Sequence, residues 1–300
     1  MRSLDPLLLA GPTAVGKSEI ALLLAEQLNG EIISVDSMQV YRGMDLGTAK
    51  ASPEQRRTIP HHLIDVIDLA ESFDAARFVQ LAHQAVAEIQ GRGRVPILCG
   101  GTGLYFKAFL DGLGSAPPPD PALRATLEAT PLPSLLRELA ERDPVTCDRI
   151  DPHNLRRIIR ALEVIRLTGQ PFSAQRALWR STPSPRFFGL ARSPEDLRHR
   201  IDARVDDMFR RGLVSETEQL LKLGLAENRT ASQALGYRQV IDHLRGSCSL
   251  PETIDLVKTR TRQFAKRQMT WFRTKLDLTW TRLDPRSTPQ STASSLAASL

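Results

Sequence analysis

Cysteine is scarce in this chain, and long apolar runs are missing. Only three cysteines, Cys99, Cys147 and Cys248, occur in 300 residues. None belongs to a CxxC pair or to a Cys/His cluster with zinc spacing, so we predict reduced thiols in a cytoplasmic protein. The longest apolar runs, residues 7–10 and 20–25, fall far short of the roughly 20 residues that cross a bilayer. We therefore expect no membrane partner, and the N-terminus gives no signal-peptide pattern.

The composition excludes a mostly disordered chain. Apolar residues make up 41% and charged residues 25%, as in soluble globular proteins. The net charge of +6 is uneven, because residues 1–120 hold 10 Lys/Arg and 14 Asp/Glu, whereas residues 121–300 hold 30 and 20. A basic second part fits either a polyanionic partner or helices covered with arginine, and charge alone leaves both interpretations open.

Short apolar segments alternate with helical periods in the first and last thirds of the chain. Between them, the proline-rich start at 117–121 is followed only by helical patterns. The alternation predicts βαβ units and a parallel sheet. We expect strands at 7–10, 31–36, 61–68, 95–101, 186–191 and 280–284. We expect helices at 18–28, 73–90, 122–129, 134–142, 154–168, 194–211, 214–223, 231–245 and 251–275.

Residues 11–18, GPTAVGKS, match the phosphate-loop pattern GxxxxGK[ST] between a predicted strand and a predicted helix. In such a loop, backbone N–H groups converge on an anion at a helix N-terminus. Lys17 would place a cation on the terminal phosphates, and the Ser18 hydroxyl can hold Mg²⁺. The pattern does not distinguish ATP from another diphosphate. The expected phosphate-binding residues are Gly11, Pro12, Thr13, Ala14, Val15, Gly16, Lys17 and Ser18.

These patterns predict an α/β fold, a P-loop NTPase-like parallel sheet flanked by helices, with an all-helical insertion domain. The expected domains are a core of residues 1–113 and 186–285 and an insertion of residues 114–185. Residues 286–300 are rich in Ser, Thr and Ala without a periodic apolar face, so we expect a flexible tail.

Asp36 follows the second predicted strand, at the edge of a parallel sheet where ligands bind. Position alone leaves its role open between a Mg²⁺-linked carboxylate, a helix N-cap and a general base. By themselves, Gln39 and the GGTG run at 100–103 do not indicate a functional site, because a loop glutamine and a glycine-rich turn after a strand are common.

The order of motifs along the chain resembles the tRNA dimethylallyltransferase (tRNA isopentenyltransferase) family. No zinc-finger pattern of the kind seen in some eukaryotic members occurs, so the resemblance is to the bacterial type. The matching segments are GPTAVGKS (11–18), DSMQVYRGMDLGTAK (36–50), PHHLID (60–65), GGTGLY (100–105), DPHNLRRIIRALEV (151–164), RIDARVDDM (200–208), ALGYRQ (234–239) and AKRQMTWFR (265–273).

The resemblance implies transfer of a dimethylallyl group from dimethylallyl diphosphate to N6 of the adenosine 3′ of the anticodon, position 37, in tRNAs reading codons that begin with U. The phosphate loop would then hold the diphosphate leaving group, with Mg²⁺ as cofactor. The expected partners are the tRNA anticodon stem-loop and dimethylallyl diphosphate, and we expect a monomer.

The resemblance also implies roles for particular residues. Asp36 would be the general base, and Thr102 a second contact near the reacting groups. Arg200 would clamp the diphosphate, with its neighbour Arg204 as the alternative. Gln39 has an amide suited to an adenine edge.

Contacts with tRNA are expected from four stretches, which are the loop of Asp36 and three stretches that carry cations or aromatic residues, and the insertion domain supplies one of them. Seven Lys/Arg and no acidic residue lie between Leu256 and Leu276, where Val257, Phe264 and Trp271 recur at a helical spacing and are expected to pack inward. The expected tRNA-binding residues are Asp36, Ser37, Met38, Gln39, Arg156, Arg157, Arg160, Gly236, Tyr237, Arg238, Lys266, Arg267, Gln268, Trp271 and Arg273.

Two other functions share parts of this pattern. A small-molecule kinase or an isopentenyltransferase acting on free adenine nucleotides would need the phosphate loop but not the basic second part. A non-catalytic RNA-binding protein that uses a nucleotide as a switch would need both, but no general base.

Overall fold

The structure is a computed structural model that describes residues 4–175 and 186–300 of the chain. The chain forms two compact units, one of residues 1–110 and 181–300 and the other of residues 111–180. These limits lie within five residues of the expected insertion domain. Among the described residues, no helix combines the length and apolarity that a membrane crossing requires.

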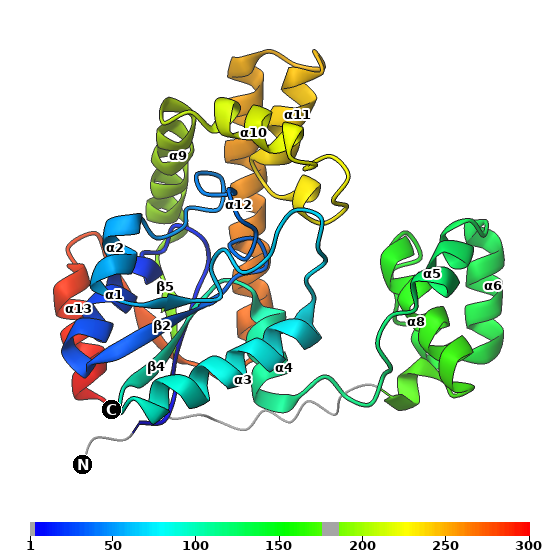
Figure 1. The fold of residues 1–300 in the computed structure, drawn as a ribbon, viewed down its shortest axis with the longest axis horizontal. Helices are drawn as coiled ribbons and strands as arrows, with labels where there is room; N and C mark the ends of the chain where they lie inside the picture. The colour runs from blue at the N-terminus through cyan, green and yellow to red at the C-terminus, as the bar shows by residue number, and fades with distance from the viewer. Residues whose placement is uncertain (1–3, 176–185) are drawn as a thin grey trace. The chain divides into compact units, whose positions relative to one another are not determined.

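A six-stranded sheet forms the centre of the first unit (Figure 1). Every strand pair in it is parallel, and the spatial order β3-β2-β4-β1-β5-β6 requires crossover connections. The α/β fold with a parallel sheet is therefore confirmed. The strands are β1 (Leu7–Ala10), β2 (Gly30–Val35), β3 (His61–His62), β4 (Val95–Gly100), β5 (Phe187–Ala191) and β6 (Thr279–Arg282).

Helices cover both faces of this sheet, which explains why β1, β2 and β4 are buried along their whole length. Alternate residues of a strand point to opposite faces. Leu7 and Leu9 pack in the cluster beneath α1 (Lys17–Leu28), α9 (Pro194–Arg210) and α13 (Pro289–Ala298). Leu8 and Ala10 pack in the cluster beneath α3 (Ala75–Gly91) and α4 (Gly103–Asp111). Both faces are thus apolar, so the polar chemistry of this unit is left to the loops at the strand ends.

Most helices of the first unit begin and end close to their predicted limits. Three short helices were missed, α2 and α4 here and α7 in the second unit, and the expected helix 231–245 is interrupted before Tyr237. The helices of the first unit are α1 (Lys17–Leu28), α2 (Pro53–Thr58), α3 (Ala75–Gly91), α4 (Gly103–Asp111), α9 (Pro194–Arg210), α10 (Leu213–Lys222), α11 (Tyr237–Leu244), α12 (Leu250–Lys275) and α13 (Pro289–Ala298), with a 3₁₀ turn at Ala231–Gln233.

The prediction of a strand over 61–68 is wrong beyond His62. Leu63 and Asp65 have φ values of 61° and 56°, in the left-handed region that a strand cannot contain. The chain turns there and runs back beside residues 39–42, where Asp65 N–H donates to Gln39 O and Val66 N–H donates to Val40 O. This return holds together the loop that follows β2.

The expected flexible tail at 286–300 is also wrong. Thr288 caps α13, with its hydroxyl accepting from Ser291 N–H, and Pro289 occupies the first turn. Thr292, Ala293 and Leu296 are buried against α1. A face of mostly small side chains permits this close packing, and such a face carries little hydropathy signal in a sequence.

The described residues of the second unit form helices joined by loops and contain no strand, as predicted. Leu127, Leu135, Leu139 and Leu162 belong to its own apolar core, and buried Glu163 accepts from Asp120 N–H and from the guanidinium of Arg124. Its helices are α5 (Pro121–Glu128), α6 (Leu132–Arg142), α7 (Pro144–Cys147) and α8 (Leu155–Thr168), followed by a 3₁₀ turn at Phe172–Gln175.

Candidate active site

The phosphate loop joins β1 to α1 as predicted. Its lysine side chain turns back to the backbone of the same loop. Lys17 Nζ donates to Pro12 O at 2.7 Å. Burial, helped by the positive charge of Arg204, lowers the pKa of Lys17 to about 8, although Cys99 and the Asp36 carboxylate act in the opposite direction. Lys17, Arg204 and Asp36 therefore share one electrostatic environment.

A cavity of about 410 Å³ opens beside the loop, between the start of α1 and α9. Both candidate arginines line it, and they differ in surroundings. Arg200 Nε donates to Ala14 O at 3.0 Å, while burial lowers the pKa of Arg204, partly offset by Asp36. The lining residues are Ala14, Gly16, Lys17, Ser18, Glu19, Arg200, Ala203 and Arg204.

Asp36 begins a tight turn immediately after β2. Its Oδ1 accepts from Met38 N–H at 2.8 Å and from Gln39 N–H at 3.2 Å. No helix begins at Asp36, so its role as a helix N-cap is excluded. The two hydrogen bonds fix the direction of the carboxylate, and the turn sets Met38 partly against the apolar core.

Thr102 connects the loop after β4 to the Asp36 turn. Its Oγ1 accepts from Ser37 N–H at 3.2 Å, and its own N–H donates to Val35 O at 3.2 Å. Since β2, β4 and β1 are adjacent parallel strands, Asp36, Thr102 and the phosphate loop follow three neighbouring strands at the same sheet edge.

Gln268 of α12 joins two of these loops. Its Oε1 accepts from Thr13 N–H and its Nε2 donates to Gly101 O, both at 2.9 Å. A Cβ on Gly101 would lie only 2.4 Å from Gln268 Nε2, and one on Gly103 would lie 2.2 Å from the ring of Trp271. The structure uses the Gln268 amide within the protein, a role of which the sequence gave no sign. The tRNA contacts expected of Gln268 and Trp271 stay predictions.

Gln39 is likewise engaged. Its Oε1 accepts from Ser34 Oγ at 2.8 Å, and its Nε2 donates to the carbonyls of Thr48 and Ala49. These bonds hold the amide within the loop after β2, and the contact of Gln39 with an adenine edge stays a prediction.

Gly236 and Tyr237 are buried in this structure, and their contact with tRNA stays a prediction. Tyr237 Oη donates to Glu216 Oε1 at 2.6 Å and accepts from Gly47 N–H. The Glu216 carboxylate also accepts from Leu46 N–H, so this pair anchors the loop after β2 to α10 and α11. Arg238, by contrast, is exposed.

The cations of α12 divide into two groups. Lys258 pairs with Asp206, and Arg262 makes a two-pronged ion pair with Asp202 of α9. Lys266, Arg267 and Arg273 are exposed on the C-terminal half of α12 and have no carboxylate partner among the described residues. A surface hollow of about 440 Å³ there is lined by Gln263, Lys266, Arg267, Thr270, Trp271 and Thr274.

In the second unit, Arg156 and Arg157 are exposed on α8. Arg160 is not available in the same way, because its guanidinium donates to Glu163 and to Pro117 O, each at 2.6 Å. These bonds close the helical unit, and the contact of Arg160 with tRNA stays a prediction.

The residues present fit a magnesium ion that is held chiefly by a ligand. Among the described residues no group of three or more His, Cys, Asp or Glu side chains could hold a metal, while the exposed Ser18 hydroxyl lines the cavity. Mg²⁺ commonly binds in this manner, through substrate phosphates, waters and a few protein oxygens.

A phosphate loop, an oriented carboxylate and a hydroxyl at the ends of three neighbouring parallel strands define a P-loop α/β protein. The sequence profile of IPP transferases matches residues 39–275. The tRNA dimethylallyltransferase 1 of Trichlorobacter lovleyi is 48% identical over 281 residues, 91% of this chain and 92% of that protein. The chain therefore belongs to the tRNA dimethylallyltransferase (IPP transferase) family.

Solved structures agree with this assignment. The full-length tRNA isopentenylpyrophosphate transferase of Bacillus halodurans is 40% identical, with a TM-score of 0.71 over 99% of this chain and 97% of that chain. A eukaryotic dimethylallyltransferase acting on tRNA is 31% identical, with a TM-score of 0.81 over 98% of this chain and 78% of that chain.

Proposed function

We propose that this protein transfers a dimethylallyl group from dimethylallyl diphosphate to N6 of adenosine 37 in tRNAs reading codons that begin with U. The observation that carries the proposal is the placement of Thr102 after β4, the strand next to β1, and of Asp36 after β2, the strand on the other side of β4, with Thr102 Oγ1 bonded to Ser37 N–H. A nucleophile activated by Asp36 and a diphosphate held by the loop would meet at one sheet edge.

In the proposed step, the N6 lone pair forms a bond to C1 of the dimethylallyl group while the bond between C1 and the diphosphate oxygen breaks. The electron pair of that bond leaves with the diphosphate, and the N6 proton passes to the Asp36 carboxylate. The adenine amino group is a weak nucleophile, so a base that accepts its proton contributes about 10²–10⁴-fold. The two backbone hydrogen bonds at Oδ1 hold the Asp36 carboxylate in one direction for this transfer.

The leaving group accumulates negative charge, and this chain offers it several positive groups. The start of α1 and Lys17 line the cavity beside the loop, and would offer the leaving group the N-terminal end of a helix and an ammonium group. Arg200 and Arg204 face the same cavity. Mg²⁺ bound to the diphosphate and Ser18 would further neutralise this charge.

The tRNA would be held by exposed cations rather than by the buried residues of the motifs. Lys266, Arg267 and Arg273 on α12, Arg238 on α11, and Arg156 and Arg157 in the second unit are exposed. Phosphate contacts from such residues supply most of the affinity for RNA without reading its sequence.

The test is transfer of label from ¹⁴C-dimethylallyl diphosphate to an unmodified tRNA transcript with Mg²⁺, followed by mass analysis of the nucleosides. We expect N6-dimethylallyladenosine as the product. A transcript in which G replaces A37 should give no product. Asp36→Asn keeps the Oδ1 acceptor of the turn but not the negative charge, so kcat should fall by about 10²–10⁴-fold while tRNA still binds.

Asp68→Asn is the matched control, because Asp68 is an exposed aspartate that pairs with Arg42 on the surface. Label transfer to free AMP instead of tRNA, or ATP consumption with a small acceptor, would contradict the proposal. Salt-sensitive tRNA binding without any product would also contradict it.

A further inference from the structure

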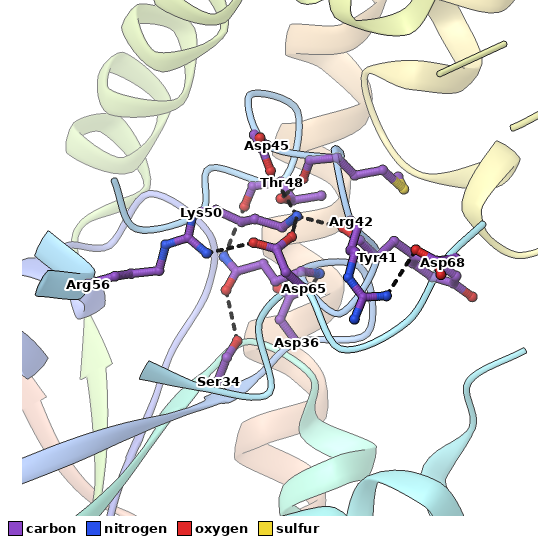
Figure 2. A network of polar contacts seen from close by, with 12 residues as sticks. Ser34, Asp36, Tyr41, Arg42, Asp45, Thr48, Lys50, Arg56, Asp65 and Asp68 are labelled. Carbon is purple, nitrogen blue, oxygen red and sulfur yellow. Dashed lines mark hydrogen bonds and ion pairs between the residues drawn. The ribbon is translucent and has the colours of Figure 1, made fainter. Parts of the chain in front are cut away.

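A buried lysine closes the loop between β2 and α2. The side chain of Lys50 is only 2% exposed, and its Nζ lies 2.5 Å from Asp65 Oδ1, 2.9 Å from Asp45 Oδ1 and 2.6 Å from Tyr41 O (Figure 2). All three ammonium hydrogens therefore have acceptors. The opposite oxygen of the Asp65 carboxylate accepts from Arg56 at 2.6 Å.

This ion pair is connected to the candidate base by two routes. Through the backbone, Asp65 N–H donates to Gln39 O at 3.1 Å, and Gln39 N–H donates to Asp36 Oδ1. Through side chains, Gln39 Nε2 donates to the carbonyls of Thr48 and Ala49, immediately before Lys50. The segment 36–50 is thus connected near its start to the backbone of Asp65 and at its end to the Asp65 side chain, through the ion pair with Lys50 that Figure 2 shows.

Backbone strain accompanies the pair. Ala49 has a φ of 49° and Asp65 a φ of 56°, conformations that L-residues seldom adopt and that persist when surrounding contacts impose them. Desolvation by itself would raise the pKa of Asp65, but the ion pairs with Lys50 and Arg56 outweigh it and lower that pKa. The two cations therefore stabilise the partly buried carboxylate.

We propose that Lys50 and Asp65 are positioning residues that hold the Asp36 turn in the orientation required for proton transfer. The proposal rests on the function proposed above. Neither residue touches a reacting group; both act through Gln39 and the backbone of the turn. A displacement of about 1 Å at a reacting group can cost about 100-fold in rate, so a misplaced carboxylate would lower kcat while leaving the phosphate loop intact.

Asp65→Asn and Asp45→Asn form a matched pair of variants. Both remove a carboxylate next to the same Nζ, but Asp45 is 54% exposed and Asp65 only 26%, and only Asp65 bonds to Gln39. Asparagine tolerates the left-handed conformation at 65, so this substitution changes charge without opposing the backbone. Lys50→Met removes the ammonium group but keeps an unbranched side chain of similar length.

We expect Asp65→Asn and Lys50→Met to lower kcat for tRNA prenylation by about 10–100-fold. Asp45→Asn should stay within about twofold, and the KM for dimethylallyl diphosphate should remain close to wild type in all three. Equal kcat values for Asp65→Asn and Asp45→Asn would overturn the proposal. So would a loss of kcat in Asp65→Asn that is matched by an equal loss of folded protein in circular dichroism.

Hydrogen–deuterium exchange of the free protein tests the same inference without the reaction. Peptides covering residues 36–50 should exchange faster in Asp65→Asn than in Asp45→Asn, whereas peptides covering residues 11–18 should not differ. Unchanged exchange of residues 36–50 would overturn the positioning role. If the wild-type protein transfers no dimethylallyl group, the proposed function fails and the exchange result still decides the role of the pair. Should Lys50→Met not fold, the two aspartate variants decide alone.

Discussion

Gln268 accepts a hydrogen bond from Thr13 N–H and donates one to Gly101 O, each at 2.9 Å. One buried side chain of α12 therefore sets the spacing between the phosphate loop and the loop that carries Thr102. The exposed cations Lys266 and Arg267 directly precede Gln268 on the same helix. A shift of α12 on binding RNA would therefore displace both loops.

Replacing Gln268 with leucine should weaken both loops at once. The change leaves Thr13 N–H and Gly101 O without their partner, and a buried unpaired polar group costs about 1–3 kcal/mol. We expect a lower midpoint of thermal unfolding and a raised KM for dimethylallyl diphosphate together with a reduced kcat. Gln263→Leu, at an exposed position of the same helix, is the control; an equal effect of the two variants would contradict a bridging role.

Diphosphate binding should depend on the protonation of Lys17. The pKa of Lys17 lies near 8 because of its burial, and only the ammonium form attracts the anion. Affinity for inorganic diphosphate should therefore be highest below pH 8 and decline above it, by up to about tenfold per pH unit. Calorimetric titration between pH 6.5 and 9.5 measures this dependence.

Lys17→Met provides the baseline for that experiment, because it retains the titration of the ligand itself. The difference between wild type and Lys17→Met should vanish toward high pH. A difference that stays constant over the whole range would show that Lys17 does not titrate near 8.

Cations of α12 should differ in their contribution to tRNA binding. Lys266 and Arg267 have no carboxylate partner among the described residues, whereas Arg262 is paired with Asp202. The double variant Lys266→Ala/Arg267→Ala should bind tRNA more weakly and with a shallower salt dependence, by a slope of up to about two. Arg262→Ala should change this slope less. Fluorescence anisotropy at several salt concentrations measures both slopes. A larger change in Arg262→Ala would refute the distinction between paired and unpaired cations of α12.

The C-terminal helix should contribute to the stability of the first unit. Leu296 is 3% exposed and packs in the cluster beneath α1, whereas Leu300 is 43% exposed. Leu296→Ala should lower the free energy of unfolding by about 2–5 kcal/mol, and Leu300→Ala by much less. Urea denaturation followed by circular dichroism gives both values, and identical midpoints would mean that α13 does not pack as described.

Local signals in the sequence determined much of this protein. The phosphate loop between β1 and α1 was recognisable because an anion cradle needs glycines and a lysine at fixed spacing. Parallel strands buried on both faces read as short apolar runs, so β1, β2, β4 and β5 were predicted within a residue or two. The motif around Asp36 was recognised only through the family resemblance, which its contiguous residues made possible.

Contacts between distant segments were decided only by the tertiary structure. Gln268 meets Thr13 across 255 positions, and Tyr237 meets Gly47 across 190, and no local pattern encodes such a pairing. Expected tRNA ligands such as Tyr237, Gln39 and Arg160 form hydrogen bonds within the protein because folding places them beside polar groups from distant segments or loops. The small-residue face of α13 became a packing surface only because α1 lies against it.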